Sequence, residues 1–204
     1  MVSHVKPMRC KLVKEPFDRR GWIFEIKWDG FRAIAEISHS EVRLYSRNQR
    51  SLTRQFAEVV SSLERLSRKH EAVLDGELVA LDAEGQSRFE WLIRRKSGRG
   101  EVVYLVFDLL YLDGQDLRSL PLLRRKNLLK KLVRSVPNVL YVDHIEERGK
   151  QFFKLAAERG LEGIVAKDGQ SPYVSGLETW YWLKIKNPQF QRKQPIDFRK
   201  KQPR

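Results

Sequence analysis

Residues 22–32 read Trp-Ile-Phe-Glu-Ile-Lys-Trp-Asp-Gly-Phe-Arg. Apolar and charged side chains alternate along the first part of this stretch, and a period of two predicts a strand with one apolar and one charged face. The charged face carries Glu25, Lys27 and Asp29. Gly30 then turns the chain into a second strand-like run, Phe31–Ile37. The stretch therefore predicts a lysine that is presented from a strand just before a turn.

The rest of the chain mixes strand and helix patterns without strict alternation. Strands are expected at 42–46, which completes an antiparallel meander with the first two, and at 72–81, 102–112, 163–167 and 180–186. Helices are expected at 52–70, with Thr53 as N-cap, at 122–133, and at 149–158, which Gly160 ends. This mixture favours an α+β fold over a doubly wound sheet.

Length and composition set the class of the chain. The 204 residues fit one domain, or one domain plus an appendage, and the formal net charge of +14 favours polyanionic partners such as nucleic acid. Cys10 is the single cysteine, so an internal disulfide framework and a four-cysteine zinc module are excluded. A secretory leader and an apolar run of about 18 residues are both absent, so we expect a cytoplasmic protein without a membrane span.

Five short segments in a fixed order carry the functional information. They are Lys27-Trp-Asp-Gly-Phe-Arg32, Asp75-Gly-Glu77, Phe107-Asp108, Glu162-Gly163 and Lys184-Ile-Lys186. In order and spacing they resemble motifs I, III, IIIa, IV and V of the covalent nucleotidyltransferases, which include ATP-dependent DNA ligases, RNA ligases and capping guanylyltransferases. The resemblance covers about residues 7–186. It implies the ATP-grasp-like adenylation fold of DNA ligases, with two antiparallel sheets flanked by helices.

Longer runs around these motifs narrow the resemblance. Residues 25–30, 46–48, 106–112 and 162–167 look like the ligase domain of bacterial and archaeal repair ligases, above all those of non-homologous end joining. The resemblance implies a monomeric DNA ligase (ATP) that seals nicked or broken duplex DNA in repair or recombination. Other end-joining repair proteins are the partners it suggests.

The resemblance also implies the reacting groups. Lys27 takes the place of the motif I nucleophile, which attacks the α-phosphorus of ATP and forms a lysyl-AMP. Phosphoryl transfer gathers negative charge, so cations beside the α-phosphate are the main requirement. Lys184 and Lys186 share one strand face and match motif V, so they are predicted to supply that charge.

Further residues are expected to bind the nucleotide. Glu77 would accept from the ribose hydroxyls, and Glu162, with Glu77, would place Mg²⁺ or Mn²⁺. Phe107 could stack on adenine or be plain core. The remaining nucleotide-binding candidates are Ile26, Arg32 and Arg47.

The predicted roles of four further residues rest on their chemistry as well as on the motifs. Arg32 and Arg47 would contact the ribose or a 5′-phosphate, since a guanidinium suits phosphate. Asp29 is predicted to support the turn after Lys27 and the water shell of the metal. Glu25 would either read the adenine edge or only pair with a cation.

Two departures from the family pattern stand out. Gln49 replaces the glycine that usually follows Ser-Arg-Asn, and it would be strained if that position needs a positive φ. The 18 residues after Lys186 are too few for the OB-fold domain that carries motif VI. We therefore expect a nucleotidyltransferase domain over 1–186 and a basic, disordered tail over 187–204, without an OB-fold.

Alternatives to a DNA ligase remain open at this stage. An RNA ligase is the enzymatic alternative, because a contact to a 2′-hydroxyl cannot be located from sequence. A catalytically weak nucleotide- or DNA-binding remnant is the other. The basic run Arg124–Lys131 is either a solvated helix face or a secondary contact to the DNA backbone, and we favour the second.

Overall fold

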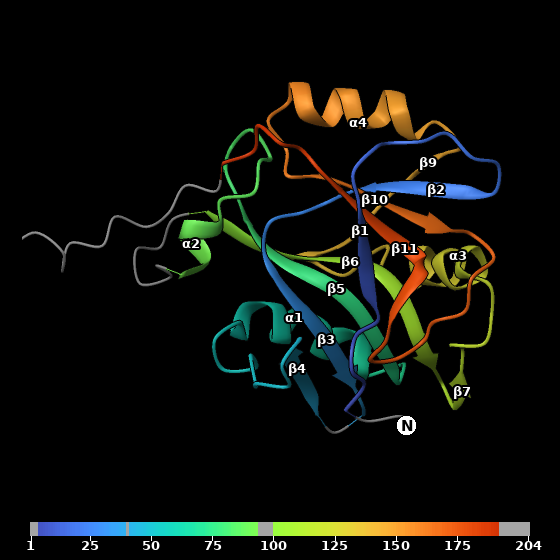
Figure 1. The fold of residues 1–204 in the computed structure, drawn as a ribbon. Helices are drawn as coiled ribbons and strands as arrows, with labels where there is room; N and C mark the ends of the chain where they lie inside the picture. Colours follow the sequence, from blue (N-terminus) through green and yellow to red (C-terminus); the bar gives the residue numbers. More distant parts are fainter. Residues whose placement is uncertain (1–3, 40, 94–99, 192–204) are drawn as a thin grey trace, which may run out of the picture.

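The computed structural model describes residues 4–39, 41–93 and 100–191 (Figure 1). Two sheets form the body of the molecule. The first has five strands in the order β1 (Arg9–Val13), β11 (Glu178–Lys186), β10 (Gly163–Asp168), β2 (Trp22–Ile26) and β9 (Ile145–Glu146). Its pairs are antiparallel except for β1 with β11.

The second sheet runs β4 (Val42–Ser46), β3 (Phe31–Ile37), β5 (Ala72–Leu81), β6 (Glu101–Leu112) and β7 (Gln115–Asp116). The short strand β8 (Val139–Tyr141) pairs in parallel with β6. This confirms the expected α+β fold with two largely antiparallel sheets, and every predicted strand is present within two residues of its bounds.

The predicted meander is wrong at its first strand. The strand β2 lies in the first sheet, where it pairs with β10 and β9, whereas β3 and β4 pair in the second. The chain crosses between the sheets at Gly30, where a Cβ atom would lie 2.2 Å from the backbone oxygen of Leu78. A glycine is needed because the backbone passes so close to β5.

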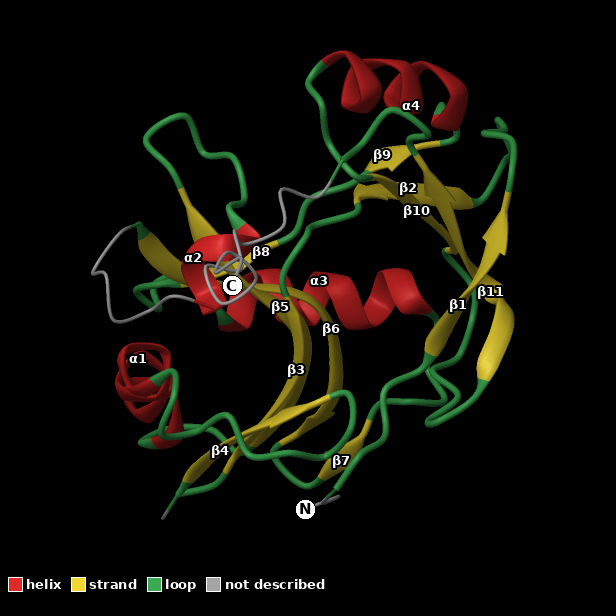
Figure 2. Ribbon diagram, turned by 60° about the vertical axis from the view of Figure 1, so that its left-hand side comes forward, coloured by secondary structure: helices red, strands yellow, loops and turns green. Residues whose placement is uncertain are grey.

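Four helices complete the described chain, and the two sheets curve around a shared interior (Figure 2). They are α1 (Ala57–Ser67), α2 (Phe89–Ile93), α3 (Leu122–Leu132) and α4 (Gly149–Glu158). The expected cap at Thr53 is wrong, since α1 begins after Phe56 and the Thr53 hydroxyl accepts from the backbone N–H of Leu44. Gly160 has a φ of +65° after α4, as its predicted role as a stop requires.

Three apolar clusters hold these layers together. One packs α1 against the second sheet through residues such as Phe56 and Leu74, and another packs α4 against the first sheet around Phe24 and Ile164. The third lies between the sheets and includes Ile34, Leu105 and Trp182. Because that interior is apolar on both walls, the polar groups that interrupt it mark the site.

None of the helices in the described residues has both the length and the apolar character that crossing a membrane requires. Of the predicted tail, residues 187–191 are described, and the expectation of disorder for 192–204 lies outside the described residues.

Candidate nucleotide site

A cavity of about 490 Å³ opens between the two sheets. It gathers side chains that the sequence had singled out in separate motifs. Those that line it are Glu25, Ile26, Lys27, Arg32, Arg47, Glu77, Phe107, Glu162, Lys184 and Lys186. Asp29 is buried outside this lining, in a smaller cavity of about 170 Å³ that Lys27 and Glu162 also border.

Lys27 stands at the end of β2 and meets Glu162, which directly precedes β10. The Nζ of Lys27 donates to Oε2 of Glu162 at 2.8 Å, and the two side chains are 22% and 10% exposed. The backbone beside this pair is fixed, since the N–H of Lys27 donates to the oxygen of Gly163 at 3.0 Å. Gly163 has a φ of +142° and lies so close to β11 that a Cβ there would be 2.0 Å from the oxygen of Ile185. The pair of motifs I and IV is therefore set by strand packing.

Lys184 and Lys186 reach the same cavity from β11. They alternate with the buried Leu183 and Ile185, which pack on the opposite face of the sheet toward α4. This confirms the prediction that both lysines share one strand face. Together with Lys27, these two lysines place three ammonium groups at the same cavity.

Glu77 is the acidic group on the facing sheet, on β5. Burial raises its pKa to about 7, although the charges of Arg32 and Lys27 oppose the shift. A carboxylate in this state changes charge near neutral pH, so its ability to accept from hydroxyl groups or to bind a cation depends on pH.

We expect Glu77 to make stability fall as pH rises. Its pKa in the folded protein, about 7, lies above the ordinary value of 4.5, so the folded state binds more protons between these values. The stabilising effect of its protonated form is complete below about pH 4.5 and is lost as the pH rises through 7. Relative to Glu77→Gln, wild type should lose about 1–3 kcal/mol of unfolding free energy between pH 5 and pH 8.

Urea unfolding of both proteins at pH 5, 6.5 and 8 tests this expectation. Every other titrating group is common to the two proteins, so their difference isolates Glu77. A difference that does not change with pH would show that Glu77 titrates at its ordinary pKa.

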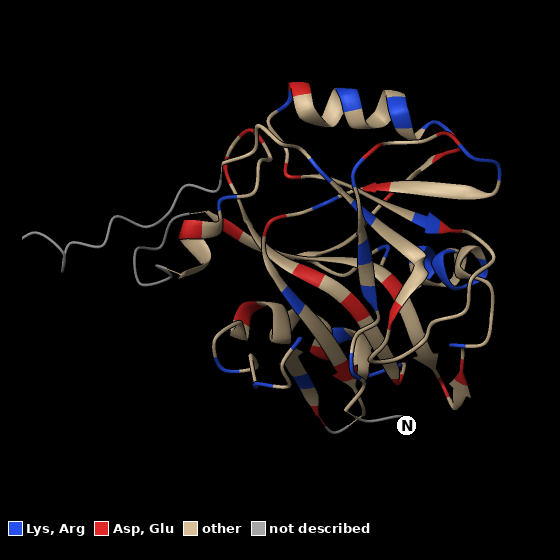
Figure 3. Cartoon of the chain, in the orientation of Figure 1, with Lys and Arg blue, Asp and Glu red and all other residues tan. Residues whose placement is uncertain are grey.

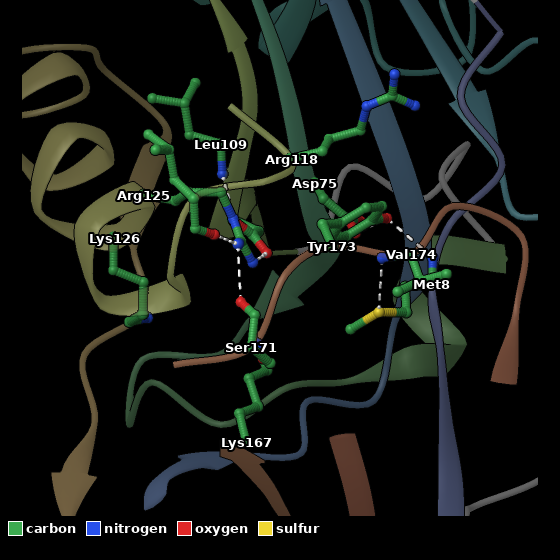
Figure 4. Close-up of polar contacts among 12 residues, drawn as sticks. Met8, Asp75, Leu109, Arg118, Arg125, Lys126, Lys167, Ser171, Tyr173 and Val174 are labelled. Atoms are coloured by element: carbon green, nitrogen blue, oxygen red, sulfur yellow. Dashed lines mark hydrogen bonds and ion pairs between the residues drawn. The ribbon is translucent and has the colours of Figure 1, made fainter. Parts of the chain in front are cut away.

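Arg32 is held by a buried network that includes Asp75 and Tyr173, which are both labelled in Figure 4. Its Nε and Nη2 donate to the two oxygens of Asp75 at 2.5 and 2.6 Å, and the hydroxyl of Tyr173 also donates to Asp75 at 2.6 Å. The bidentate edge of Arg32 is thus used by Asp75, and a phosphate would have to use its remaining donors. The guanidinium lies 4.6 Å from the centre of the Phe107 ring, so it also borders the cavity wall.

Glu25 is held by two lysines. Oε1 accepts from Nζ of Lys126 at 2.5 Å, and Oε2 is paired with Nζ of Lys167 at 2.6 Å. Burial by itself would raise the pKa of Glu25, but the two ammonium groups outweigh it and the pKa is lowered. The pairing with a cation is therefore shown, and the reading of an adenine edge stays a prediction.

The preferred interpretation of the basic run on α3 is wrong at two of its residues. Arg125 and Lys126 are fully buried and cannot contact a DNA backbone. Arg125 forms a bidentate pair with Asp108 at 2.7 and 2.8 Å and donates to the backbone oxygen of Ser171 at 3.0 Å (Figure 4). Lys and Arg positions (blue in Figure 3) recur along α3, but only part of this run is a surface. Arg124 and Lys130 are exposed, whereas Arg125 and Lys126 are not.

Phe107 is both core and cavity wall. It is 8% exposed and packs edge-on against Trp182 at 6.0 Å between ring centres, yet it lines the cavity. The two interpretations left open by the sequence are therefore compatible. Its stacking on adenine stays a prediction.

Lys167 and Trp182 are cavity residues to which the sequence analysis gave no role. Lys167 lies two residues after Val165 on β10, and both line the cavity, so the strand period was a usable signal. Trp182 precedes Lys184 by the same spacing. Its indole N–H is buried and has no hydrogen-bond partner within the described residues, which suits a ligand with acceptor atoms.

Gln49, which replaces the usual glycine, does adopt a positive φ. Its φ is +60° in the turn after β4, and its side chain donates to the backbone oxygen of Val5 at 3.3 Å. The turn therefore carries some strain, and it places the exposed Arg47 at the rim of the cavity.

The carboxylates of the cavity suit a cation whose other ligands are not protein side chains. The described residues contain no cluster of three or more His, Cys, Asp or Glu that could hold a metal ion. Mg²⁺ typically uses one or two carboxylates together with phosphate oxygens and waters. Glu162 and Glu77, which line one cavity, fit that pattern.

Two sheets enclose a cationic cavity in which a partly exposed lysine lies against a carboxylate, an arrangement suited to binding the phosphates of a nucleotide. Comparison with known proteins agrees. Residues 5–186 match the family described as ATP dependent DNA ligase domain. The chain belongs to this family.

Individual relatives point the same way. The chain is 36% identical over 186 residues to the SPbeta prophage-derived DNA ligase-like protein LigB of Bacillus subtilis, covering 90% of the chain and 67% of LigB. It is 38% identical over 171 residues to the multifunctional non-homologous end joining DNA repair protein LigD of Mycobacterium tuberculosis, covering 81% of the chain and 22% of LigD.

A solved structure titled mycobacterial DNA ligase D complexed with ATP and MES superposes with a TM-score of 0.80 at 32% identity. The match covers 89% of this chain and 60% of that one. The chain thus spans from about a fifth to two thirds of the length of these relatives.

Proposed function

We propose that this chain is the catalytic core of an ATP-dependent DNA ligase and that Lys27 carries AMP. The observation that carries the proposal is the Lys27–Glu162 pair at 2.8 Å in a cavity that Lys184 and Lys186 share. A primary amine that loses its proton attacks the α-phosphorus of ATP. The N–P bond forms, the bond from the α-phosphorus to the bridging oxygen breaks, and pyrophosphate leaves.

The other cavity residues supply binding and orientation. Glu162 holds Nζ of Lys27, and the two ammonium groups of β11 offset the charge that gathers on the phosphate. Phe107 provides a face for the base, and Glu77 an acceptor for the ribose. Glu162 and Glu77 would hold Mg²⁺ or Mn²⁺, which supplies positive charge at the phosphates when bound.

The substrate class follows from the family. We infer that the acceptor is the 5′-phosphate of nicked or broken duplex DNA, in repair or recombination, with other end-joining repair proteins as partners. The match to LigD, whose name carries non-homologous end joining, supports this, as does the net charge of +14. We further propose that the chain acts in the cytoplasm as a monomer.

Incubation with α-labelled ATP and Mg²⁺ tests the covalent step. We expect acid-labile label on wild type and a loss of at least about 10³-fold in Lys27→Ala, since the nucleophile is removed. Lys27→Arg keeps the charge and should be equally inactive. This control separates loss of the nucleophile from loss of a cation.

Sealing of a pre-adenylated nick separates the alternatives. We expect nicked DNA to be sealed and nicked RNA to be sealed far more slowly. Efficient sealing of RNA would favour the RNA ligase. No label from ATP together with no sealing would leave only a binding remnant.

A further inference from the structure

Lys126 lies behind the wall of the nucleotide cavity. It is fully buried on α3, and it is outside the described residues that line the cavity, whereas its partner Glu25 is among them. Its Nζ donates to Glu25 at 2.5 Å and to the backbone oxygen of Val142 at 2.9 Å. Glu25 is therefore the lining residue through which Lys126 is bonded to the cavity wall.

Glu25 sits at the same end of the cavity as Phe107. The connecting group is Lys167, whose Nζ pairs with Glu25 at 2.6 Å and lies 4.2 Å from the centre of the Phe107 ring. A base stacked on Phe107 would therefore present an edge near this carboxylate. An ionised carboxylate only accepts hydrogen bonds, so it favours an edge that carries an amino group.

Neutralisation of Glu25 does not require both lysines. One carboxylate between Lys126 and Lys167 leaves a buried surplus of positive charge, and Lys167 alone would give a neutral pair. A surplus buried cation costs stability. Lys126 nevertheless contributes to the geometry of the Glu25 carboxylate. It pairs with Oε1, while Lys167 pairs with Oε2. The plane of the carboxylate is thereby fixed from two sides.

We propose that Lys126 is a positioning residue that makes the cavity selective for a 6-amino purine by fixing the carboxylate of Glu25. This rests on the proposed function, since it takes a nucleotide as the ligand. Without Lys126, the carboxylate turns toward Lys167 and its acceptor lone pairs leave the base edge. ATP then loses the advantage of its amino group.

Calorimetric titration without divalent metal tests the proposal, because binding is then measured without the covalent step. The ligands are ATP and purine riboside triphosphate, which lacks the 6-amino group. Wild type should bind ATP at least about tenfold more tightly, as expected for a hydrogen bond to a charged group. In Lys126→Met the ratio should fall to about 1–2.

Lys130→Met is the matched control. Lys130 lies one turn further along α3 and is exposed, so the same substitution removes the same charge without touching Glu25. Its affinity ratio should equal that of wild type. Should Lys126→Met fail to fold, Lys126→Gln replaces it, with a ratio reduced at least about threefold.

The affinity ratios of wild type and the Lys126 variant decide whether the proposal holds. An unchanged ratio in the Lys126 variant shows a structural role only, whatever happens to its stability, and overturns the proposal. A wild type that does not distinguish the two ligands overturns it as well. A wild type that prefers ATP but forms no lysyl-AMP rejects the ligase chemistry, and the ratios still test Lys126 independently.

Discussion

Replacing Arg125 by leucine should destabilise the protein by about 3–5 kcal/mol, because Asp108 would be left charged and unpaired in the interior. Both side chains are 0% exposed, and they are joined by two hydrogen bonds of 2.7 and 2.8 Å. Arg125 also donates to the backbone oxygens of Leu120 and Ser171, which would lose a donor. Urea unfolding followed by tryptophan fluorescence measures the loss.

Two variants make this measurement specific. Arg124→Leu changes the neighbouring, exposed arginine of the same helix and should alter stability by less than about 0.5 kcal/mol. The double variant Arg125→Leu/Asp108→Leu removes both charges and should recover about half of the loss, since the oxygens of Leu120 and Ser171 still lack the Arg125 donor and the N–H of Leu109 loses Asp108 as its acceptor. A double variant as unstable as the single one would mean that the buried charge is not the cause.

The helix α3 links the Arg125–Asp108 pair to the nucleotide cavity. Arg125 ties the helix to Asp108 on β6, next to Phe107, while Lys126 ties it to Glu25 on β2. One helix therefore fixes the wall residue Glu25 in the first sheet and the direct neighbour of the wall residue Phe107 in the second. A loosened α3 should affect nucleotide binding before the protein unfolds.

This role of α3 could not be predicted from the sequence. Three consecutive basic residues, Arg124 to Lys126, predict a solvated or DNA-facing surface unless the acidic partners are known. The partners lie 17 and 101 residues away in the sequence, so no local pattern connects them to the helix. The burial of Arg125 and Lys126 therefore depends on tertiary ion pairs, which a local charge pattern does not indicate.

Local sequence patterns predicted the strands more accurately than the role of α3, because the period of apolar side chains is enough to indicate a strand. The nearly all-apolar run of β6 predicted that strand to within one residue, because a strand buried on both faces carries little else. The assignment of β2 to a meander failed because period does not specify a pairing partner. The cavity residues were predicted through motif order, which reflects the whole family rather than any one segment.

The largest electrostatic effect on catalysis is expected at Lys184. Replacing it by methionine keeps most of the side chain but removes the charge that faces the cavity from β11. Removal of one donor that stabilises developing charge typically costs about 10²–10³-fold in rate. We expect a loss of this size in the rate of lysyl-AMP formation at saturating ATP.

Lys11→Met supplies the comparison for this last variant. Lys11 lies on the adjacent strand β1, where its ammonium group sits 4.1 Å from the centre of the Trp180 ring, outside the described lining of the cavity. It carries the same charge, so a general effect of net charge would slow both variants alike. If Lys184 stabilises the transition state, its loss lowers the maximal rate. If it only binds ATP, the loss appears in KM and disappears at saturation.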